Sequence, residues 1–215
     1  MKAILKNNLS FLVPYSVYIL LGAALIFVNS KAETHLSFNS FHNPFLDTFN
    51  TYTTYLGDGV TATLFIMMLL TVKYRFFIIA AAANIISAMI TQSLKHFVFE
   101  DVVRPKKFFE GLQELYFVPG IDNHMYHSFP SGHSTCAFAM YFSFCLMAKN
   151  KIYKLLFFIL AILTGYSRVY LSQHFFEDVY AGSIIGVSTA FVVFYFVQHK
   201  KHEWMDRSIV NFFNK

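Results

Sequence analysis

The chain has 215 residues, about the length of one domain, and 56% of them are hydrophobic whereas only 13% are charged. Soluble domains usually carry about 25% charged residues, so the composition excludes an ordinary soluble protein. The formal net charge of +5 comes without a basic stripe of interleaved aromatic residues, which argues against a nucleic-acid partner. Several apolar runs reach about 18 residues, the length that crosses a hydrocarbon core. They predict an all-α polytopic membrane protein with a single domain over residues 1–215.

The apolar runs predict a bundle of six transmembrane helices. These runs cover residues 11–28, 60–72, 76–97, 131–147, 155–171 and 175–197. The second run is short, and we expect this span to extend back toward Tyr55. Residues 29–58 are polar and rich in aromatic side chains, which predicts a short interfacial segment between the first two spans. A polar tail follows at 199–215.

Lysine and arginine residues predict the orientation of the bundle. An even number of spans puts both termini on one side, and most basic residues fall there, including those of the turns at 73–75 and 149–154. Basic loops stay in the cytoplasm, so we predict cytoplasmic termini in a bacterial inner membrane. The polar loop 99–129 then faces the periplasm or exterior. The same face receives the candidate polar groups Lys95, Arg104, His133, His174 and Asp178.

The stretch between the last two spans carries a chemically suggestive arrangement. His174 and Asp178 are spaced i, i+4, which places both on one face of a helix that starts near Phe175. The carboxylate can then accept a hydrogen bond from one ring nitrogen and leave the other free to attack. Arg168 offers a planar charged fork that suits phosphate oxygens. Taken alone, the stretch is equally consistent with a short polar loop.

A second arrangement lies at the start of the fourth span. Pro130 fits the first turn of a helix, and Ser131 and Gly132 then present N–H groups to an anion at the helix N-terminus. His133 lies beside that anion and can protonate a leaving oxygen. In the simpler alternative, Ser131 only caps the helix and His133 is an interfacial residue.

Three cations lie near the same membrane boundary: Lys95, Arg104 and Arg168. Any one of them alone is explained by a side chain that extends to lipid head groups. Three cations that converge on two histidines and a helix N-terminus are better explained by a bound phosphoryl group, because donors must neutralise the charge of that group in the transition state.

These motifs together resemble the type-2 phosphatidic acid phosphatase superfamily, whose pattern is Lys with Arg-Pro, then Pro-Ser-Gly-His, then Ser-Arg with His and Asp. The matching residues are Lys95, Arg104-Pro105, Pro130-Ser131-Gly132-His133, Ser167-Arg168, His174 and Asp178. The motif-bearing core covers about residues 90–197. The spacing between Lys95 and Arg104 is longer than the usual one, which puts Lys95 in question and makes Lys106 and Lys107 alternative phosphate ligands.

The resemblance implies a role for each residue. His174 would attack phosphorus and form a phosphohistidine, Asp178 would orient it, and His133 would protonate the leaving group and later activate water. The phosphate would be held by Lys95, Arg104, Ser131, Gly132 and Arg168. Neither a metal nor another cofactor is expected.

We therefore predict an integral membrane phosphatase that hydrolyses a phosphomonoester or pyrophosphate of a lipid. Candidate substrates are undecaprenyl pyrophosphate, phosphatidylglycerol phosphate, phosphatidate and lipid A, with membrane lipids around them and no obligate protein partner. Two alternatives stay open. One is a lipid phosphotransferase that uses the same phosphoenzyme, and the other is a non-catalytic lipid-binding or transport protein.

Overall fold

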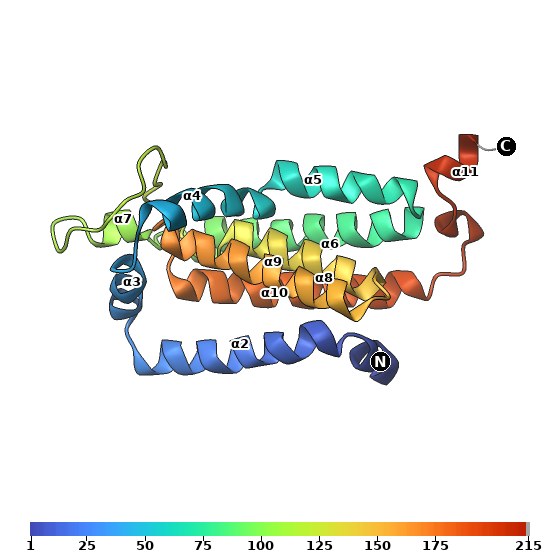
Figure 1. The fold of residues 1–215 in the computed structure, drawn as a ribbon, viewed down its shortest axis with the longest axis horizontal. Coiled ribbons are helices and arrows are strands. Elements are labelled where there is room, and N and C mark those ends of the chain that lie inside the picture. The colour runs from blue at the N-terminus through green and yellow to red at the C-terminus, as the bar shows by residue number, and fades with distance from the viewer. Residues whose placement is uncertain (214–215) are drawn as a thin grey trace.

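The computed structural model describes residues 1–213, and helices are the regular structure of this part of the chain. The all-α prediction is therefore confirmed. Asn214 and Lys215, which end the predicted tail, lie outside the described residues. Long helices run side by side along the longest axis of the molecule (Figure 1). They are α2 (Leu9–Val28), α6 (Tyr74–Ser93), α8 (Gly132–Met147), α9 (Lys151–Tyr170) and α10 (Phe176–Gln198).

Shorter helices connect and flank these. They are α1 (Lys2–Asn7), α3 (Lys31–Asn39), α4 (Pro44–Thr53), α5 (Gly59–Met68), α7 (Pro105–Phe108) and α11 (Ile209–Phe213). Four tighter or wider turns complete the set: η1 (Thr54–Gly57), η2 (Leu69–Thr71), η3 (Leu94–Val98) and η4 (Glu203–Asp206). Helices α1 and α11 lie at one end of the bundle, whereas α3 and α7 lie at the other (Figure 1).

The number of membrane spans is lower than expected when each helix is judged by length and apolarity. Four of the described helices are long and apolar enough to cross a membrane, and a bent pair, Pro44–Gly57 with Gly59–Thr71, gives up to five. Helix α8 has 16 residues, fewer than the about 20 that span a bilayer core. Most of its side chains are buried by other helices. The six-span count thus stays a prediction, while the helical membrane fold is established.

The expected extension of the second span toward Tyr55 takes the form of a bent pair of helices, not of one continuous helix. The chain bends by 57° between Gly57 and Gly59, and Tyr55 lies in the preceding turn η1. Asp58 adopts an extended conformation at the bend, and its carboxylate accepts a hydrogen bond from the N–H of Val60 at 3.0 Å. An aspartate in this position caps a new helix, so α5 starts at Gly59 as a separate element.

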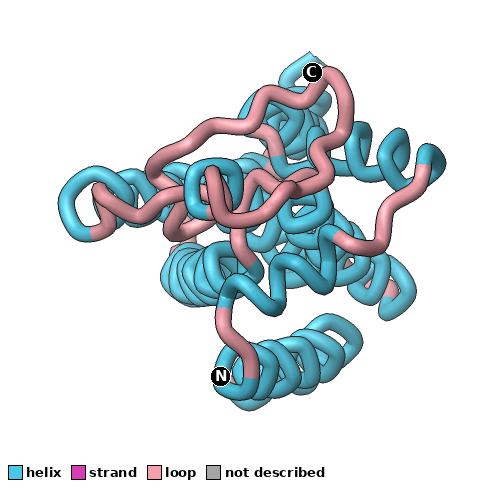
Figure 2. The backbone as a smooth tube through the Cα atoms, turned by 90° about the vertical axis from the view of Figure 1, so that its left-hand side faces the viewer, coloured by secondary structure: helices cyan, strands magenta, loops and turns pink. Residues whose placement is uncertain are grey.

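The polar connection expected at the membrane interface forms two helices, α3 and α4. Ser30 starts α3 with a capping box, in which its side chain and Glu33 satisfy each other's backbone N–H groups. Seen from the end that carries α3 and α7, most of the loops gather on that face of the bundle (Figure 2). The polar groups of the site lie in or next to these loops.

Close packing of α10 on α8 brings the two helix starts together. A Cβ atom on Gly182 would lie 2.7 Å from the carbonyl oxygen of Ser131, and one on Gly186 would lie 2.6 Å from that of Thr135. Only glycine lets the backbones approach this closely, as in small-residue contacts between membrane helices. The N–H of Ser131 consequently donates to the carbonyl oxygen of Asp178 at 3.0 Å.

Candidate active site

A cavity of about 400 Å³ collects most of the predicted site residues. Its walls come from the α4–α5 bend, the end of α6, the loop before α8, the start of α8, and the α9–α10 connection. Six of the eight predicted residues line it: Lys95, Arg104, Gly132, His133, Arg168 and His174. Asp178 is fully buried behind His174, and Ser131 does not reach the cavity wall.

His174 and Asp178 have the geometry that their spacing predicts. The Nδ1 atom of His174 lies 3.2 Å from Oδ2 of Asp178. The same oxygen accepts hydrogen bonds from the hydroxyl of Ser128 and from the N–H of Phe175. A carboxylate favours Nδ1–H on the imidazole, which leaves Nε2 as the free nitrogen.

The electrostatic surroundings keep His174 neutral. Its side chain is buried, and this burial lowers the pKa of His174 well below 6.5. Arg104, Arg168 and Lys95 lower this pKa further, because each positive charge disfavours an imidazolium nearby. A neutral imidazole with a free nitrogen is a competent nucleophile at neutral pH.

Gln173 connects the two arginines, a function that its sequence position did not reveal. Its side-chain oxygen accepts from Nη1 of Arg104 and from Nη2 of Arg168, each at 3.3 Å. Its side-chain nitrogen donates to Oδ1 of Asn123 at 2.6 Å. Arg168 is held a second time by the hydroxyl of Thr54 at 2.6 Å. Both guanidinium groups are therefore fixed before any anion arrives.

Lys95 reaches the site because α6 ends in a π-helical turn. The turn spans Leu94–Val98, and a wide turn of this kind takes up an additional residue and is frequent at functional sites. Lys95 is 6% exposed, and its Nζ donates to the carbonyl oxygen of His127 at 2.9 Å. The alternative ligands lie elsewhere: Lys107 pairs with Glu110, and Lys106 lines a separate hollow. The long spacing to Arg104 thus does not remove Lys95 from the cavity.

The start of α8 differs in detail from the expectation. Pro130 precedes the cap instead of occupying the first turn, Ser131 is the N-cap, and Gly132 is the first helical residue. The N–H of Ser131 is occupied by Asp178 and its Oγ accepts from Ser134, so the geometry gives no support to Ser131 as a phosphate ligand. Gly132 and His133 do line the cavity, at a helix N-terminus whose N–H groups suit an anion.

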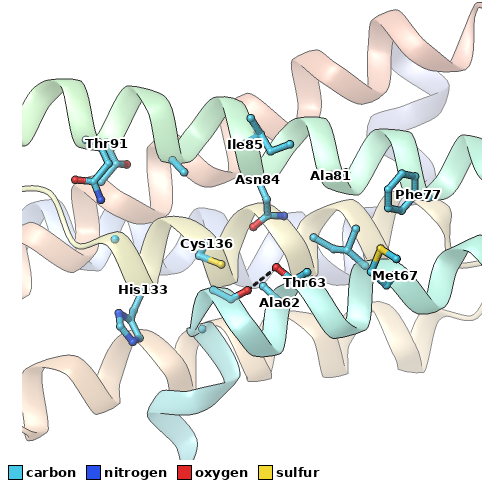
Figure 3. A pocket seen from close by; sticks show the side chains of 16 residues that line it. Ala62, Thr63, Met67, Phe77, Ala81, Asn84, Ile85, Thr91, His133 and Cys136 are labelled. Carbon is cyan, nitrogen blue, oxygen red and sulfur yellow. Dashed lines mark hydrogen bonds between the residues drawn. The ribbon is translucent and has the colours of Figure 1, made fainter.

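An apolar groove of about 520 Å³ adjoins the cavity between α5, α6 and α8. Figure 3 shows Ala62 and Met67 of α5 opposite Phe77 and Asn84 of α6. Ala81 of α6 also lines the groove. Gln92, Gly132 and His133 line both spaces, so the groove and the cavity meet at these residues. A ligand with a charged head and an apolar chain would fit the two together.

Four site residues were missed by sequence reasoning: Thr54, Asp58, Ser128 and Gln173. Thr54 and Asp58 belong to the segment that we interpreted as an interfacial connection. Gln173 lies within a motif because it directly precedes His174, but nothing in the spacing distinguishes it from its neighbours.

Comparisons with known proteins identify a family and two similar solved structures. Residues 76–202 match the model of the PAP2 superfamily. The crystal structure of LpxE from Aquifex aeolicus is similar with a TM-score of 0.68 and 26% identity, over 76% of this chain and 94% of that one. The transmembrane PAP2 type phosphatidylglycerolphosphate phosphatase from Bacillus subtilis is similar with a TM-score of 0.64 and 25% identity, over 89% and 98%. No match was found among the curated proteins.

Proposed function

Because this chain belongs to the PAP2 superfamily, we propose that it is an integral membrane phosphatase that removes phosphate from a lipid phosphate or pyrophosphate through a phosphohistidine on His174. The observation that carries the proposal is the neutral imidazole of His174, held by Asp178 and directed at a cavity that three cations line. One of the two structural relatives is a transmembrane PAP2 type phosphatidylglycerolphosphate phosphatase, which supports the reaction class.

In the first step, Nε2 of His174 attacks phosphorus while the bond from phosphorus to the lipid oxygen breaks. The electron pair of that bond stays on the lipid oxygen, which takes the proton of a charged His133. Lys95, Arg104 and Arg168 neutralise the charge on the phosphoryl oxygens, a contribution that positioned donors make without reorganising. Asp178 stabilises the positive charge that His174 acquires.

In the second step, water attacks the phosphohistidine. His133, now neutral, takes a proton from that water and returns to its charged form. The bond between phosphorus and Nε2 breaks, and His174 leaves as the neutral imidazole. Lysine and arginine side chains supply the positive charge throughout, so we expect activity to survive EDTA.

The apolar groove supports a lipid as the substrate. A phosphate in the cavity has its leaving oxygen near His133, where the groove begins. A hydrocarbon chain attached to that oxygen can continue between α5 and α6 toward Phe77 (Figure 3). Apolar side chains line this groove, so it suits the hydrocarbon chain of a lipid and offers nothing to a soluble phosphate ester without one.

Phosphate release by the purified protein tests the function. The protein should release phosphate from at least one of lipid A, undecaprenyl pyrophosphate, phosphatidylglycerol phosphate and phosphatidate, and His174→Ala should abolish this release. Wild-type protein quenched in alkali during turnover of a ³²P-labelled substrate should carry an acid-labile label on His174. Normal turnover by His174→Ala, or a label trapped on His133, would refute the mechanism. Transfer of the label to an added lipid alcohol in place of water would identify a phosphotransferase.

Narrowing the groove tests whether the substrate is a lipid. Ala81→Phe fills the groove without touching the phosphate cavity. We expect about a tenfold or larger drop in kcat/KM for a long-chain lipid phosphate, because the added ring takes up space that the chain would fill. Hydrolysis of nitrophenyl phosphate should not change. Ile86→Phe on the same helix, outside the groove lining, is the matched control. Equal losses on both substrates would count against a lipid chain in the groove.

A further inference from the structure

The bend between α4 and α5 contributes to the cavity although it lies outside residues 76–202, which match the family model. Asp58 occupies the bend and lines the cavity. The bend packs directly on the first turn of α8, because a Cβ atom on Gly57 would lie only 2.7 Å from the carbonyl oxygen of His133. Asp58 is thereby held beside the start of the helix that carries His133.

Asp58 also stands where the phosphate cavity meets the apolar groove. Its two neighbours, Gly57 and Gly59, line the groove, while Asp58 itself lines the cavity. His133 lines both spaces. With a phosphate in the cavity and a lipid chain in the groove, the bond to be broken lies at this junction.

His133 needs a negatively charged neighbour to act as a general acid. The charged groups that act on it most strongly are Arg168, Asp58, Arg104 and Lys95, and Asp58 is the one acid among these four. The cations and the partly buried position disfavour an imidazolium, whereas proton donation requires one. The titratable or charged groups that line the cavity from all its elements are Tyr55, Asp58, Lys95, Arg104, Asp122, His124, His133, Arg168 and His174. Asp122 lies on the outer loop, next to Asn123, which holds Gln173.

We propose that Asp58 is a positioning residue that keeps His133 protonated in the enzyme–substrate complex, so that His133 can protonate the departing lipid oxygen. The proposal rests on the phosphatase function proposed above. Asp58 keeps its own charge through the cycle: the proton passes from His133 to the lipid oxygen in the first step and returns to His133 from water in the second. The carboxylate stabilises the charged imidazole before the first step and after the second.

Asp58 has a structural function as well, and the test must separate the two. Its carboxylate caps α5 by accepting from the N–H of Val60. Asparagine and serine cap helices about as well as aspartate, but neither carries a charge. Asp58→Asn and Asp58→Ser therefore keep the cap and remove the charge. Asp58→Glu restores the charge and serves as the rescue variant.

The dependence on the leaving group gives the first readout. Asp58→Asn should lower kcat for a lipid phosphate by about 10–100-fold, a part of the 10²–10⁴-fold that general acid catalysis contributes. Nitrophenyl phosphate, whose leaving group needs no proton, should lose less than about threefold. The alkaline limb of the kcat profile should move to lower pH, and Asp58→Asn should add no further loss to His133→Asn. Equal losses on both substrates, or an unmoved alkaline limb, would overturn the proposal.

A titration of His133 gives a second readout that needs no turnover. In protein with ¹⁵N-labelled histidine and bound orthophosphate, the NMR titration midpoint of His133 should fall by about one pH unit or more in Asp58→Asn, as expected when a negative charge is removed from the same cavity. Asp58→Glu should restore it. An unchanged midpoint would overturn the proposal. If the midpoint shifts but the protein releases no phosphate, the effect of Asp58 on the pKa of His133 is supported and the proposed reaction is refuted.

Discussion

At the scale of single residues, Asp178 Oδ2 accepts hydrogen bonds from three groups: the ring of His174, the hydroxyl of Ser128 and the N–H of Phe175. Asp178→Asn removes the charge that fixes the tautomer of His174 and stabilises its positive form after attack. We expect kcat to fall roughly 10²–10⁴-fold with little change in KM, since the cations that we propose to bind phosphate are untouched. Steady-state kinetics measures both values.

Ser128→Ala is the matched control for this prediction. It removes one of the three donors and leaves the charge of Asp178 in place, so its loss in kcat should be about tenfold or less, in line with one hydrogen bond. A loss as large as that of Asp178→Asn would mean that the charge on Asp178 contributes little to catalysis.

The buried side chain of His35 on α3 makes the free energy of unfolding depend on pH. It is buried between the rings of Phe109 and Phe175, and its Nε2 lies 3.2 Å from the hydroxyl of Ser172. Burial lowers the pKa of His35 to about 4. Between pH 6.5 and 4 the unfolded chain therefore binds a proton that the folded protein does not, and the free energy of unfolding falls as the pH falls.

The loss by pH 4.5 amounts to about 2–3 kcal/mol from this residue. His35→Gln keeps a hydrogen-bonding group near Ser172 and cannot titrate, so its thermal midpoint in detergent should fall less between pH 7 and 4.5 than that of the wild type. His202→Gln, at an exposed position, should behave as the wild type does. An identical pH response of His35→Gln and the wild type would contradict this account.

Among the elements, the π-helical turn Leu94–Val98 places Lys95 in the wall of the cavity. Lys95→Met should lower kcat/KM by about 10²–10³-fold, the usual cost of one donor aimed at a charged transition state. Lys106→Met and Lys107→Met should lower it less than about threefold, because neither lysine lines the cavity. Kinetics on one lipid phosphate compares the three variants. A larger loss in Lys106→Met or Lys107→Met than in Lys95→Met would reverse the assignment.

At the scale of the whole molecule, orientation in the membrane is the open prediction. Helices α1 and α11 lie at one end of the bundle and the loops around the site lie at the other (Figures 1 and 2). The basic residues at the terminal end predict that it is cytoplasmic. In a background without Cys136 and Cys145, cysteines at the exposed positions Leu112 and Lys151 should label from opposite sides. In intact cells, an impermeant reagent should reach only the one at position 112, and labelling of both would contradict the topology.

Three features can be predicted from the sequence alone: that the chain is a membrane protein, that it is helical, and which residues form the three motifs. Apolar runs are contiguous in the chain, and the i, i+4 spacing of His174 and Asp178 acts within one turn, so both are visible without the fold. The motif residues Lys95, Arg104 and Arg168 were found for the same reason, since each lies close to a boundary between a span and a polar loop.

The other groups of the site come together only when the helices pack, so they are visible in the tertiary structure and not in the sequence. Thr54 and Asp58 reach it through a 57° bend, and Gln173 bonds to two arginines that come from different segments. Local spacing cannot predict such contacts, because they arise when helices far apart in the chain pack together. The length of α8 is a similar case: at 16 residues it is buried by its neighbours, so packing sets its surroundings more than contact with lipid does.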